Sequence, residues 1–154
     1  MMTVRIMPLL PEHVAPLAQA LYAEWHDFAP WSSVEKIHAY YRECLNGEPL
    51  PTAFAAVDGQ GRLKGSAALK RHDIKAFAEY EYWLGDVFVL PECRGEGVGR
   101  LLVRHCLSAA RAMKLPSLYL YTPDMQAVYA KFGWREIRQH EYNGETVSVM
   151  KLDL

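Results

Sequence analysis

The sequence predicts a single α/β domain, α+β by stricter criteria, in which a mixed central β-sheet is flanked by helices. Its 154 residues are 51% hydrophobic and 23% charged, as in a globular chain. β-rich stretches alternate with helix-periodic ones, and no repeat, low-complexity run or linker separates them. A chain of this length buries roughly 70% of its unfolded surface, so it can sustain a core without disulfides or a structural metal. We therefore expect one domain spanning residues 1–154.

The first quarter of the sequence reads as a strand followed by two helices. Thr3–Met7 is a short β-rich stretch. Pro11 then opens a segment whose apolar residues recur three and four positions apart as far as Trp25, which predicts a helix. A second helix is expected after Ser33, a preferred N-cap residue, and it should end near Gly47.

The middle of the chain predicts three strands. Thr52–Val57 and Leu63–Leu69 are joined by Asp58–Gly61, whose residues suit the positive φ angles of a tight reversal, so these strands should form a hairpin. The next β-rich stretch is Trp83–Leu90, which Pro91 ends.

The last third predicts two helices and three strands. The clearest helix starts at Val98, and its apolar stripe is expected to comprise Val98, Leu101, Leu102, Cys106, Ala109 and Met113. A strand over Ser117–Tyr121 and a short helix over Asp124–Phe132 should follow. Trp134–Tyr142 and Thr146–Leu152 form a predicted hairpin, because Asn143-Gly144 favours a two-residue turn.

Charge and residue types exclude several classes of function. Seventeen Lys and Arg against eighteen Asp and Glu give a net charge of -1, which argues against nucleic-acid binding. The three cysteines form no CxxC pair and the six histidines no ligand spacing, so we expect no metal. Cys93 has no partner at a spacing that supports a nucleophile. The cysteine pattern also makes a disulfide framework unlikely, so we expect a cytoplasmic protein. The sequence has no apolar run of about 18 residues, so we expect no membrane partner.

A glycine-rich stretch follows the strand that Pro91 ends. Residues 94–100 read Arg-Gly-Glu-Gly-Val-Gly-Arg and lead into the predicted helix. Glycines let backbone N–H groups converge, and a helix N-terminus adds about half a positive charge, so this arrangement favours a phosphate ligand. Arg100 stands where a dinucleotide fingerprint needs its third glycine and where a P-loop needs its glycine-lysine pair. Both of those sites are therefore disfavoured.

This stretch resembles the acetyl-coenzyme A signature of the GCN5-related N-acetyltransferases (GNAT). A second, weaker similarity lies about 30 residues further on, in Tyr129-Ala-Lys-Phe-Gly-Trp134, which resembles the C-terminal tyrosine and Gly-aromatic element of that family. The resemblance implies the acyl-CoA N-acyltransferase fold, with splayed fourth and fifth strands, and acetyl-CoA as cosubstrate. The residues that it assigns to the pyrophosphate and to the pantetheine arm are Val87, Phe88, Val89, Arg94, Gly95, Gly97, Val98, Gly99 and Arg100.

Acetyl transfer to an amine requires a neutral amine, a polarised thioester carbonyl and a proton for the departing thiolate. Tyr129 matches the family position that commonly acts as general acid. For the general base we select Glu81, at the start of the fourth strand, while three alternatives stay open: His72, Glu79 and Asp86. The carbonyl oxygen is expected to meet the backbone N–H of Val87 or Val89.

Acceptor specificity in this family comes mainly from the first two helices and from the segment entering the fourth strand. We expect an ammonium-bearing substrate there, because these segments combine aromatic rings with carboxylates. The selected residues are Trp25, Asp27, Trp31 and Tyr82. The resulting hypothesis is an acetyl-CoA-dependent N-acetyltransferase that transfers directly to a primary amine of a small molecule or peptide. A silent CoA-binding module, another acyl-CoA and a homodimer through the C-terminal strands all stay open.

Overall fold

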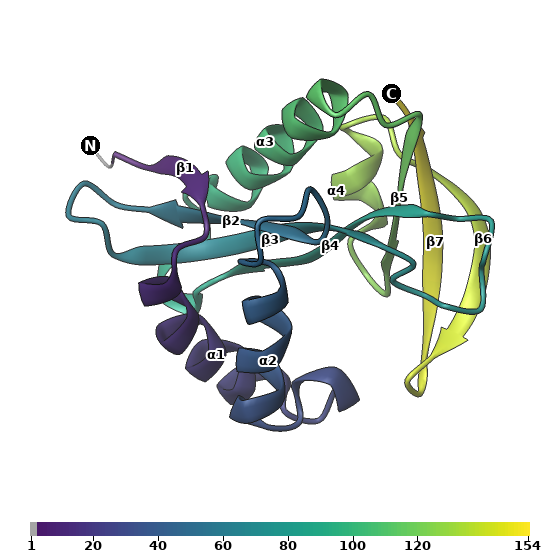
Figure 1. Cartoon of the computed structure of the whole chain (residues 1–154). Coiled ribbons are helices and arrows are strands. Elements are labelled where there is room, and N and C mark those ends of the chain that lie inside the picture. The colour runs from purple at the N-terminus through teal and green to yellow at the C-terminus, as the bar shows by residue number, and fades with distance from the viewer. Residues whose placement is uncertain (1–2) are drawn as a thin grey trace.

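The computed structural model describes residues 3–154, and its central feature is one seven-stranded sheet with the order β1-β2-β3-β4-β5-β7-β6 (Figure 1). All neighbouring strands are antiparallel except β4 and β5, so the sheet is mixed, as predicted. The strands are β1 (Arg5–Pro8), β2 (Thr52–Val57), β3 (Leu63–Arg71), β4 (Tyr82–Val89), β5 (Ser117–Thr122), β6 (Arg135–Tyr142) and β7 (Glu145–Asp153). The helices are α1 (Pro11–Trp25), α2 (Val34–Glu43), α3 (Val98–Ala112) and α4 (Gln126–Ala130), with 3-10 turns η1 (Ala29–Trp31) and η2 (Pro91–Cys93).

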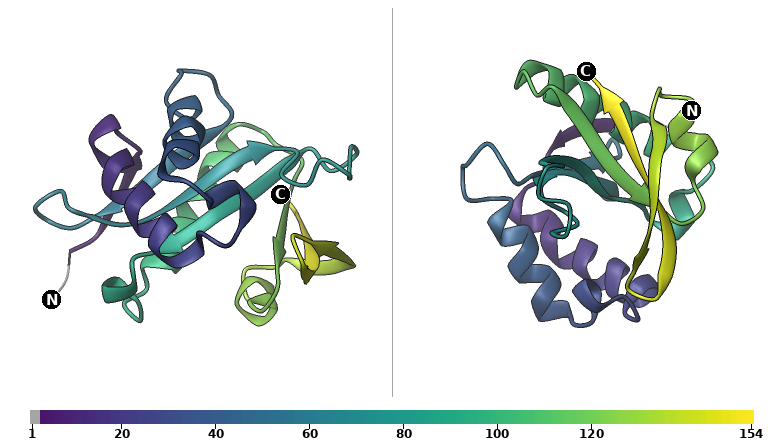
Figure 2. Two further views of the ribbon diagram at one scale, coloured as in Figure 1. Left: turned by 90° about the horizontal axis from the view of Figure 1, so that it is seen from below. Right: turned by 90° about the vertical axis from the view of Figure 1, so that its right-hand side faces the viewer.

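Helices cover both faces of the sheet. α3 lies on one face, and α1 and α2 lie side by side on the other (Figures 1 and 2). Each face has its own apolar cluster, the first built around α3 and the second around α1 and α2. A third, smaller cluster joins the loop after β3 to β5 and β7 and includes Ile74, Trp83 and Val149. Within residues 3–154, no helix is long and apolar enough to cross a membrane.

Local sequence signals explain where the first helices begin. Pro11 occupies the first turn of α1, where a missing N–H group costs nothing. Ser33 is the N-cap of α2, and its side chain accepts a hydrogen bond from the backbone N–H of Lys36. Both helices therefore start where the sequence predicts.

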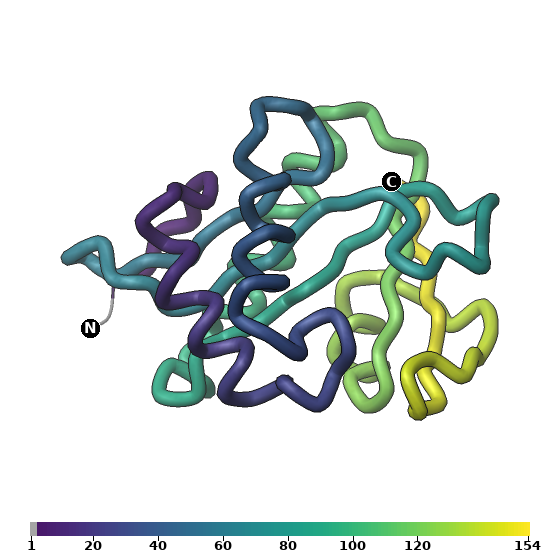
Figure 3. Tube along the Cα trace, turned by 60° about the horizontal axis from the view of Figure 1, so that its bottom comes forward, coloured from purple at the N-terminus to yellow at the C-terminus, as the bar shows by residue number. Residues whose placement is uncertain are grey.

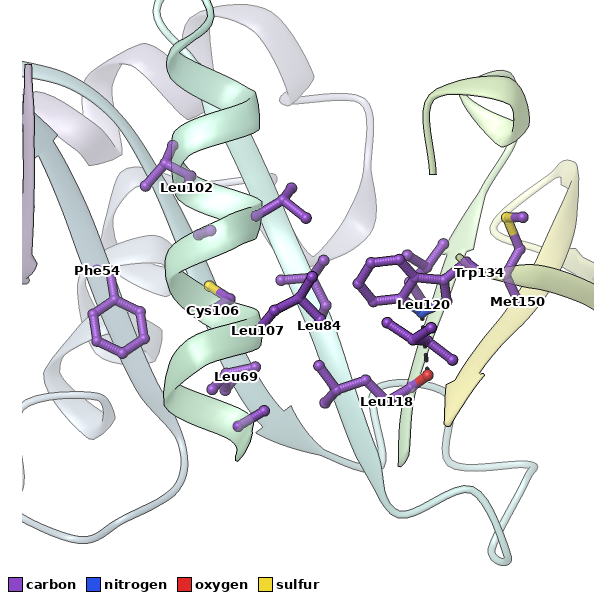
Figure 4. Close-up of a cluster of buried hydrophobic side chains, with 14 of the residues drawn as sticks. Phe54, Leu69, Leu84, Leu102, Cys106, Leu107, Leu118, Leu120, Trp134 and Met150 are labelled. Atoms are coloured by element: carbon purple, nitrogen blue, oxygen red, sulfur yellow. Dashed lines mark hydrogen bonds between the residues drawn. The ribbon is translucent and has the colours of Figure 1, made fainter. Parts of the chain in front are cut away.

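The buried face of α3 differs from the predicted stripe. Leu101 is 38% exposed, whereas Val103, Leu107 and Ala110 are buried together with Val98, Leu102 and Cys106. Leu102, Cys106 and Leu107 of α3 belong to one apolar cluster with Phe54, Leu69, Leu84 and Leu118 of the sheet (Figure 4). The sheet contacts α3 along two adjacent rows of side chains, and the residues within each row are four positions apart. The buried stripe is therefore wider than predicted.

The C-terminal part of the fold has an order that the local pattern did not indicate. β7 lies between β5 and β6, although β6 precedes it in the chain. The hairpin turn at Asn143 and Gly144 is as predicted, and both residues have positive φ, 49° and 82°. The α4 helix is shorter than predicted, Gln126–Ala130 instead of Asp124–Phe132. Trp134 follows it, and its indole Nε1 donates a 3.1 Å hydrogen bond to the Leu118 carbonyl (Figure 4).

A β-bulge interrupts β4. Ser66 of β3 pairs with Phe88, but Ala68 pairs with Gly85, so one strand holds an extra residue at this point. Asp86 lies in the bulge and has a φ of +57°, a strained backbone angle for a residue other than glycine. The bulge also breaks the alternation of faces, because Leu84 belongs to the α3 cluster whereas Phe88, four residues later, belongs to the α1/α2 cluster.

Candidate active site

The glycine loop lies between the end of β4 and the N-terminus of α3. Gly95 and Gly97 have φ angles of +82° and +83°, and Gly97 is the N-cap of α3. A Cβ built on either glycine would meet no atom within 4 Å, so the space above the loop is open. Gly99 has no positive φ, and a Cβ there would make an ordinary 3.6 Å contact with Val89. The loop therefore offers backbone N–H groups at a helix N-terminus, an arrangement that suits a phosphate.

The edge of β4 beyond the bulge carries backbone groups that β3 does not use. Leu90 donates its N–H to the Lys64 carbonyl on β3, and successive residues of a strand point to opposite sides. The N–H and carbonyl of Val89 therefore point away from β3, toward β5. In the described part of the chain, β4 and β5 pair at one register position only, Trp83 with Tyr119.

A small pocket opens on the α1/α2 side of the bulge. Its cavity volume is about 80 Å³. Aromatic rings form its walls, and they come from four parts of the chain: Phe28 and Trp31 around η1, Tyr40 of α2, Tyr121 of β5 and Tyr142 of β6. Figure 3 shows the segment around η1 beside the C-terminal hairpin, and the rings of Phe28 and Tyr142 lie 6.3 Å apart.

Three charged side chains form the polar part of this pocket. Lys70 Nζ lies 2.9 Å from Asp73 Oδ1 and 3.1 Å from Asp86 Oδ2. The hydroxyl of Tyr40 donates a 2.5 Å hydrogen bond to Asp86 Oδ2. All three charged side chains are largely buried, with exposures of 14%, 10% and 9% for Lys70, Asp73 and Asp86.

Burial and mutual charge shift the titration of this group. Burial, reinforced by the nearby Asp86 carboxylate and only partly opposed by Lys70, raises the pKa of Asp73 to about 6. Burial alone would lower the pKa of Lys70, but the two carboxylates outweigh it and raise that pKa. Burial and then Asp86 raise the pKa of Tyr40. With one lysine and two aspartates the cluster has a formal charge of -1, and the Tyr40 phenol beside it is protonated at neutral pH.

The comparison with known families identifies the family of this chain. The sequence model of the acetyltransferase (GNAT) family matches residues 18–134, a span that includes the glycine loop, β4 and Tyr129. The chain belongs to the GNAT acetyltransferase family. It is therefore an acyltransferase, and the cosubstrate typical of its family is acetyl-CoA. Among curated proteins, none matches this GNAT sequence significantly.

Solved structures agree with this GNAT fold. The spermidine/spermine N-acetyltransferase of Vibrio cholerae, in mutant form, is 18% identical, with a TM-score of 0.72 over 98% of this chain and 95% of that one. A protein of Acinetobacter baylyi ADP1 described as an acetyltransferase is 14% identical, with a TM-score of 0.80 over 100% and 93%. A GNAT-family protein of Desulfovibrio desulfuricans is 16% identical, with a TM-score of 0.78 over 98% and 99%.

The residues of this GNAT chain that are predicted to bind the cofactor lie together, but their side chains are not equally able to contact a ligand. Val98 is buried, so only its backbone can reach a ligand, while Arg100 is exposed. Arg94 is committed elsewhere in this structure: its guanidinium lies 2.5 Å from Glu24 of α1, and its Nε donates to the Val89 carbonyl. It also lies over the Phe88 ring. These contacts hold the Arg94 side chain against α1 and β4 in this structure, and its remaining N–H groups are the ones that could contact a phosphate.

Tyr129 lies on α4, where its ring meets the edge of Trp134 at 5.8 Å. Burial, and next the nearby Cys106, raise the pKa of Tyr129 to about 12. The phenol is therefore protonated at neutral pH and can donate a hydrogen bond. Its pKa exceeds the value of roughly 8.5 for an ordinary thiol, so a thiolate placed beside it would receive a hydrogen bond and not the proton itself.

The residues predicted for the acceptor do not all come together. Trp31 lines the pocket, and Trp25 packs edge-on against Phe88. The Asp27 side chain is fully exposed. Glu81 and Tyr82 lie at the start of β4, where both contact Arg71, and Glu81 is 46% exposed in its ion pair with that arginine. None of Asp27, Glu81 and Tyr82 is among the residues that line the pocket.

Sequence reasoning missed Lys70, Asp73, Tyr40 and Tyr142 as pocket residues and kept Asp86 only as an alternative base. The sequence signal for Lys70 and Asp73 was a lysine and an aspartate close together at the end of a predicted strand. Charged side chains in such positions are usually exposed to solvent. Their meeting with Asp86 depends on the bulge, which turns that side chain toward α2. Within residues 3–154, no group of three or more His, Cys, Asp or Glu side chains could hold a metal ion.

Proposed function

We propose that this GNAT enzyme transfers an acetyl group from acetyl-CoA directly to a slim primary amine that enters the pocket beside Asp86. The observation that carries the proposal is the placement of both sites on one strand. β4 presents Asp86 to the pocket at its bulge, turns the backbone N–H of Val89 away from β3 beyond it, and ends at the glycine loop. A thioester held along this edge would therefore meet an amine held in the pocket.

The chemistry of the pocket favours an ammonium ligand. Its aromatic walls and its two carboxylates attract a cation, and Lys70 leaves a net charge of -1 for the ligand to neutralise. The cavity of about 80 Å³ admits the end of an alkylamine more readily than an amino group on a bulky ring or a folded peptide. Two of the structures with a similar fold are of the spermidine/spermine N-acetyltransferase of Vibrio cholerae, so an amine acceptor also agrees with the name of that protein.

The proposed reaction forms one bond and breaks one, without a covalent enzyme intermediate. The ammonium gives its proton to a pocket carboxylate, which releases it to solvent before the attack, and Asp73 is the better acceptor because its pKa is closer to neutral. The amine nitrogen then attacks the thioester carbon, whose oxygen receives the backbone N–H of Val87 or Val89. The C–S bond breaks, and the Tyr129 hydroxyl donates a hydrogen bond to the departing thiolate. The proton that the new amide nitrogen loses passes to the same pocket carboxylate.

The release of free thiol from acetyl-CoA in the presence of a panel of amines tests this proposal. We expect release with short primary alkylamines and little with neutral or anionic acceptors. A panel that also contains propionyl-CoA and longer acyl-CoA esters separates acetyl transfer from transfer of another acyl group. If CoA binds but no acyl-CoA and amine pair releases thiol, the chain is a silent CoA-binding module.

The rate should depend on pH in two regimes. The amine reacts only when neutral, so log kcat/KM for the acceptor should rise with a slope of about 1 below the amine pKa of roughly 10. Asp73 is charged above its pKa of about 6 and protonated below it, so below that pH the pocket loses its net charge and the slope should approach 2. Asp73→Asn should retain a slope of 1 throughout. A wild-type slope of 1 down to pH 5 would show that Asp73 does not titrate in the reaction.

Asp86→Asn and Glu81→Gln form a matched pair for locating the acceptor carboxylate. Asn adopts positive φ more readily than most residues, so Asp86→Asn should preserve the bulge while it removes the charge. Because a hydrogen bond to a charged group contributes roughly 1.5–3 kcal/mol, we expect acceptor kcat/KM to fall about 10- to 100-fold. Glu81→Gln should change it less than about twofold. The reverse pattern would return the role of base to Glu81.

A further inference from the structure

The Lys70 ammonium group occupies a complete ammonium site. Its Nζ lies 2.9 Å from an Asp73 oxygen, 3.1 Å from an Asp86 oxygen and 4.7 Å from the centre of the Tyr40 ring. Two carboxylates and an aromatic face are the contacts by which a protein would recognise the ammonium group of a ligand. In this molecule a side chain of the protein makes them.

The backbone is shaped to accommodate this site. A Cβ on Gly85 would lie 2.9 Å from Lys70 Cδ and 3.0 Å from Asp73 Oδ2, so the lysine stem and the Asp73 carboxylate pack directly over the glycine. The β4 bulge begins at the next residue, Asp86, and turns its carboxylate onto the same ammonium. The site is thus made by three elements that converge on Nζ, in contrast to an incidental surface ion pair.

We propose that Lys70 fills a second ammonium site in the acceptor pocket and thereby restricts the enzyme to acceptors with a single ammonium group. This inference rests on the proposed function. Lys70 is a specificity-determining residue: a diamine that places one nitrogen at the thioester would bring its second ammonium toward a site that is already occupied.

The charge balance of the pocket supports this assignment. Of the nine residues that line the cavity, Lys70, Asp73 and Asp86 carry formal charge, and the others are aromatic or proline. The sum of one cation and two carboxylates is -1, which a monoamine neutralises completely. A second ammonium would give the pocket an excess positive charge in a region with little water, which is unfavourable. Without Lys70 the sum becomes -2, which matches a diammonium ligand.

The test compares butylamine with 1,4-diaminobutane, which have the same carbon chain, as acceptors for the wild type, Lys70→Ala and Lys70→Arg. Wild type should favour butylamine in kcat/KM. Lys70→Ala both empties the site and removes its charge, so the ratio of diamine to monoamine kcat/KM should rise at least tenfold. Lys70→Arg keeps a cation in the site and should keep the wild-type preference. An unchanged ratio in folded Lys70→Ala, or a wild type that prefers the diamine, would overturn the proposal.

Thermal unfolding without acetyl-CoA gives a second readout that does not need activity. At millimolar concentration, 1,4-diaminobutane should raise the Tm of Lys70→Ala more than butylamine does, and it should restore a melting transition if this variant is unfolded alone. Lys70→Ala/Asp73→Asn, with a net charge of -1, should lose the diamine preference. Equal stabilisation by the two amines would contradict an emptied ammonium site. A wild type that releases no thiol with any amine would overturn the proposed function, whereas these shifts would still report on the Lys70 site.

Discussion

Gly97→Asp is expected to abolish the stabilisation of the fold by CoA. Gly97 is the N-cap of α3, its φ is +83°, and no atom lies within 4 Å of a Cβ placed there, so the new carboxylate would project into the space proposed for the pyrophosphate. With ligand at about one hundred times its Kd, wild type should gain roughly 2.7 kcal/mol. For a chain of this length that corresponds to a Tm increase of about 5 to 11 °C. The variant should show none.

Gly47→Asp is the matched control for this experiment. Gly47 lies between α2 and β2, has a φ of +85°, and a Cβ added to it would likewise meet no atom within 4 Å. The control therefore introduces the same backbone strain and the same charge away from the loop, and it should keep the full CoA-dependent shift in Tm. A Gly97→Asp protein that CoA stabilises as much as wild type would remove the phosphate from the glycine loop.

Tyr129→Phe is expected to reduce kcat by about 10²- to 10³-fold, the usual effect of losing one hydrogen-bond donor to developing charge. The ring and its 5.8 Å contact with Trp134 are retained, so stability and CoA affinity should stay close to wild type. Initial rates of thiol release and CoA binding by calorimetry separate the two quantities. An unchanged kcat would leave Tyr129 with a packing role only.

Tyr119→Phe provides the comparison for that loss. Tyr119 is a buried tyrosine of β5 that stacks on Tyr80 outside the acceptor pocket. Its variant likewise loses one hydroxyl, from a ring that is more buried than that of Tyr129, and kcat should change by less than about twofold. Equal losses of activity in both variants would point to a general structural effect instead of hydrogen-bond donation by Tyr129.

The strand, glycine loop and helix proposed to hold the cofactor could be predicted from the sequence because their signal is local. The strand, the loop and the helix that would hold the pyrophosphate are consecutive in the chain, and glycines at Gly95 and Gly97 take φ angles that other residues adopt at a cost. The side-chain detail was not predictable. Arg94 pairs with Glu24, which is 70 residues away in sequence, and no local pattern reports such a contact.

The acceptor side could not be predicted in the same way. Tyr40 and Asp86 are 46 residues apart, and Tyr142 reaches the Asp73 carbonyl across 69 residues. Regular alternation along β4 would place Asp86 on the same face as Leu84, against α3. The bulge places Asp86 on the opposite face instead, toward α2. The sequence presents Asp86 as one of several charged residues near this strand, whereas the structure places its carboxylate in a buried cluster.

The sequence by itself determined the type and order of the elements, the mixed sheet and the position of the glycine loop, because hydrophobic period, caps and turn residues act over a few neighbouring positions. Only the tertiary structure decided the insertion of β7 between β5 and β6, the wider buried face of α3, and the convergence of Lys70, Asp73 and Asp86. These features depend on strand register and on packing between distant segments. A one-residue bulge changes which face a side chain occupies, and the local sequence pattern does not record it.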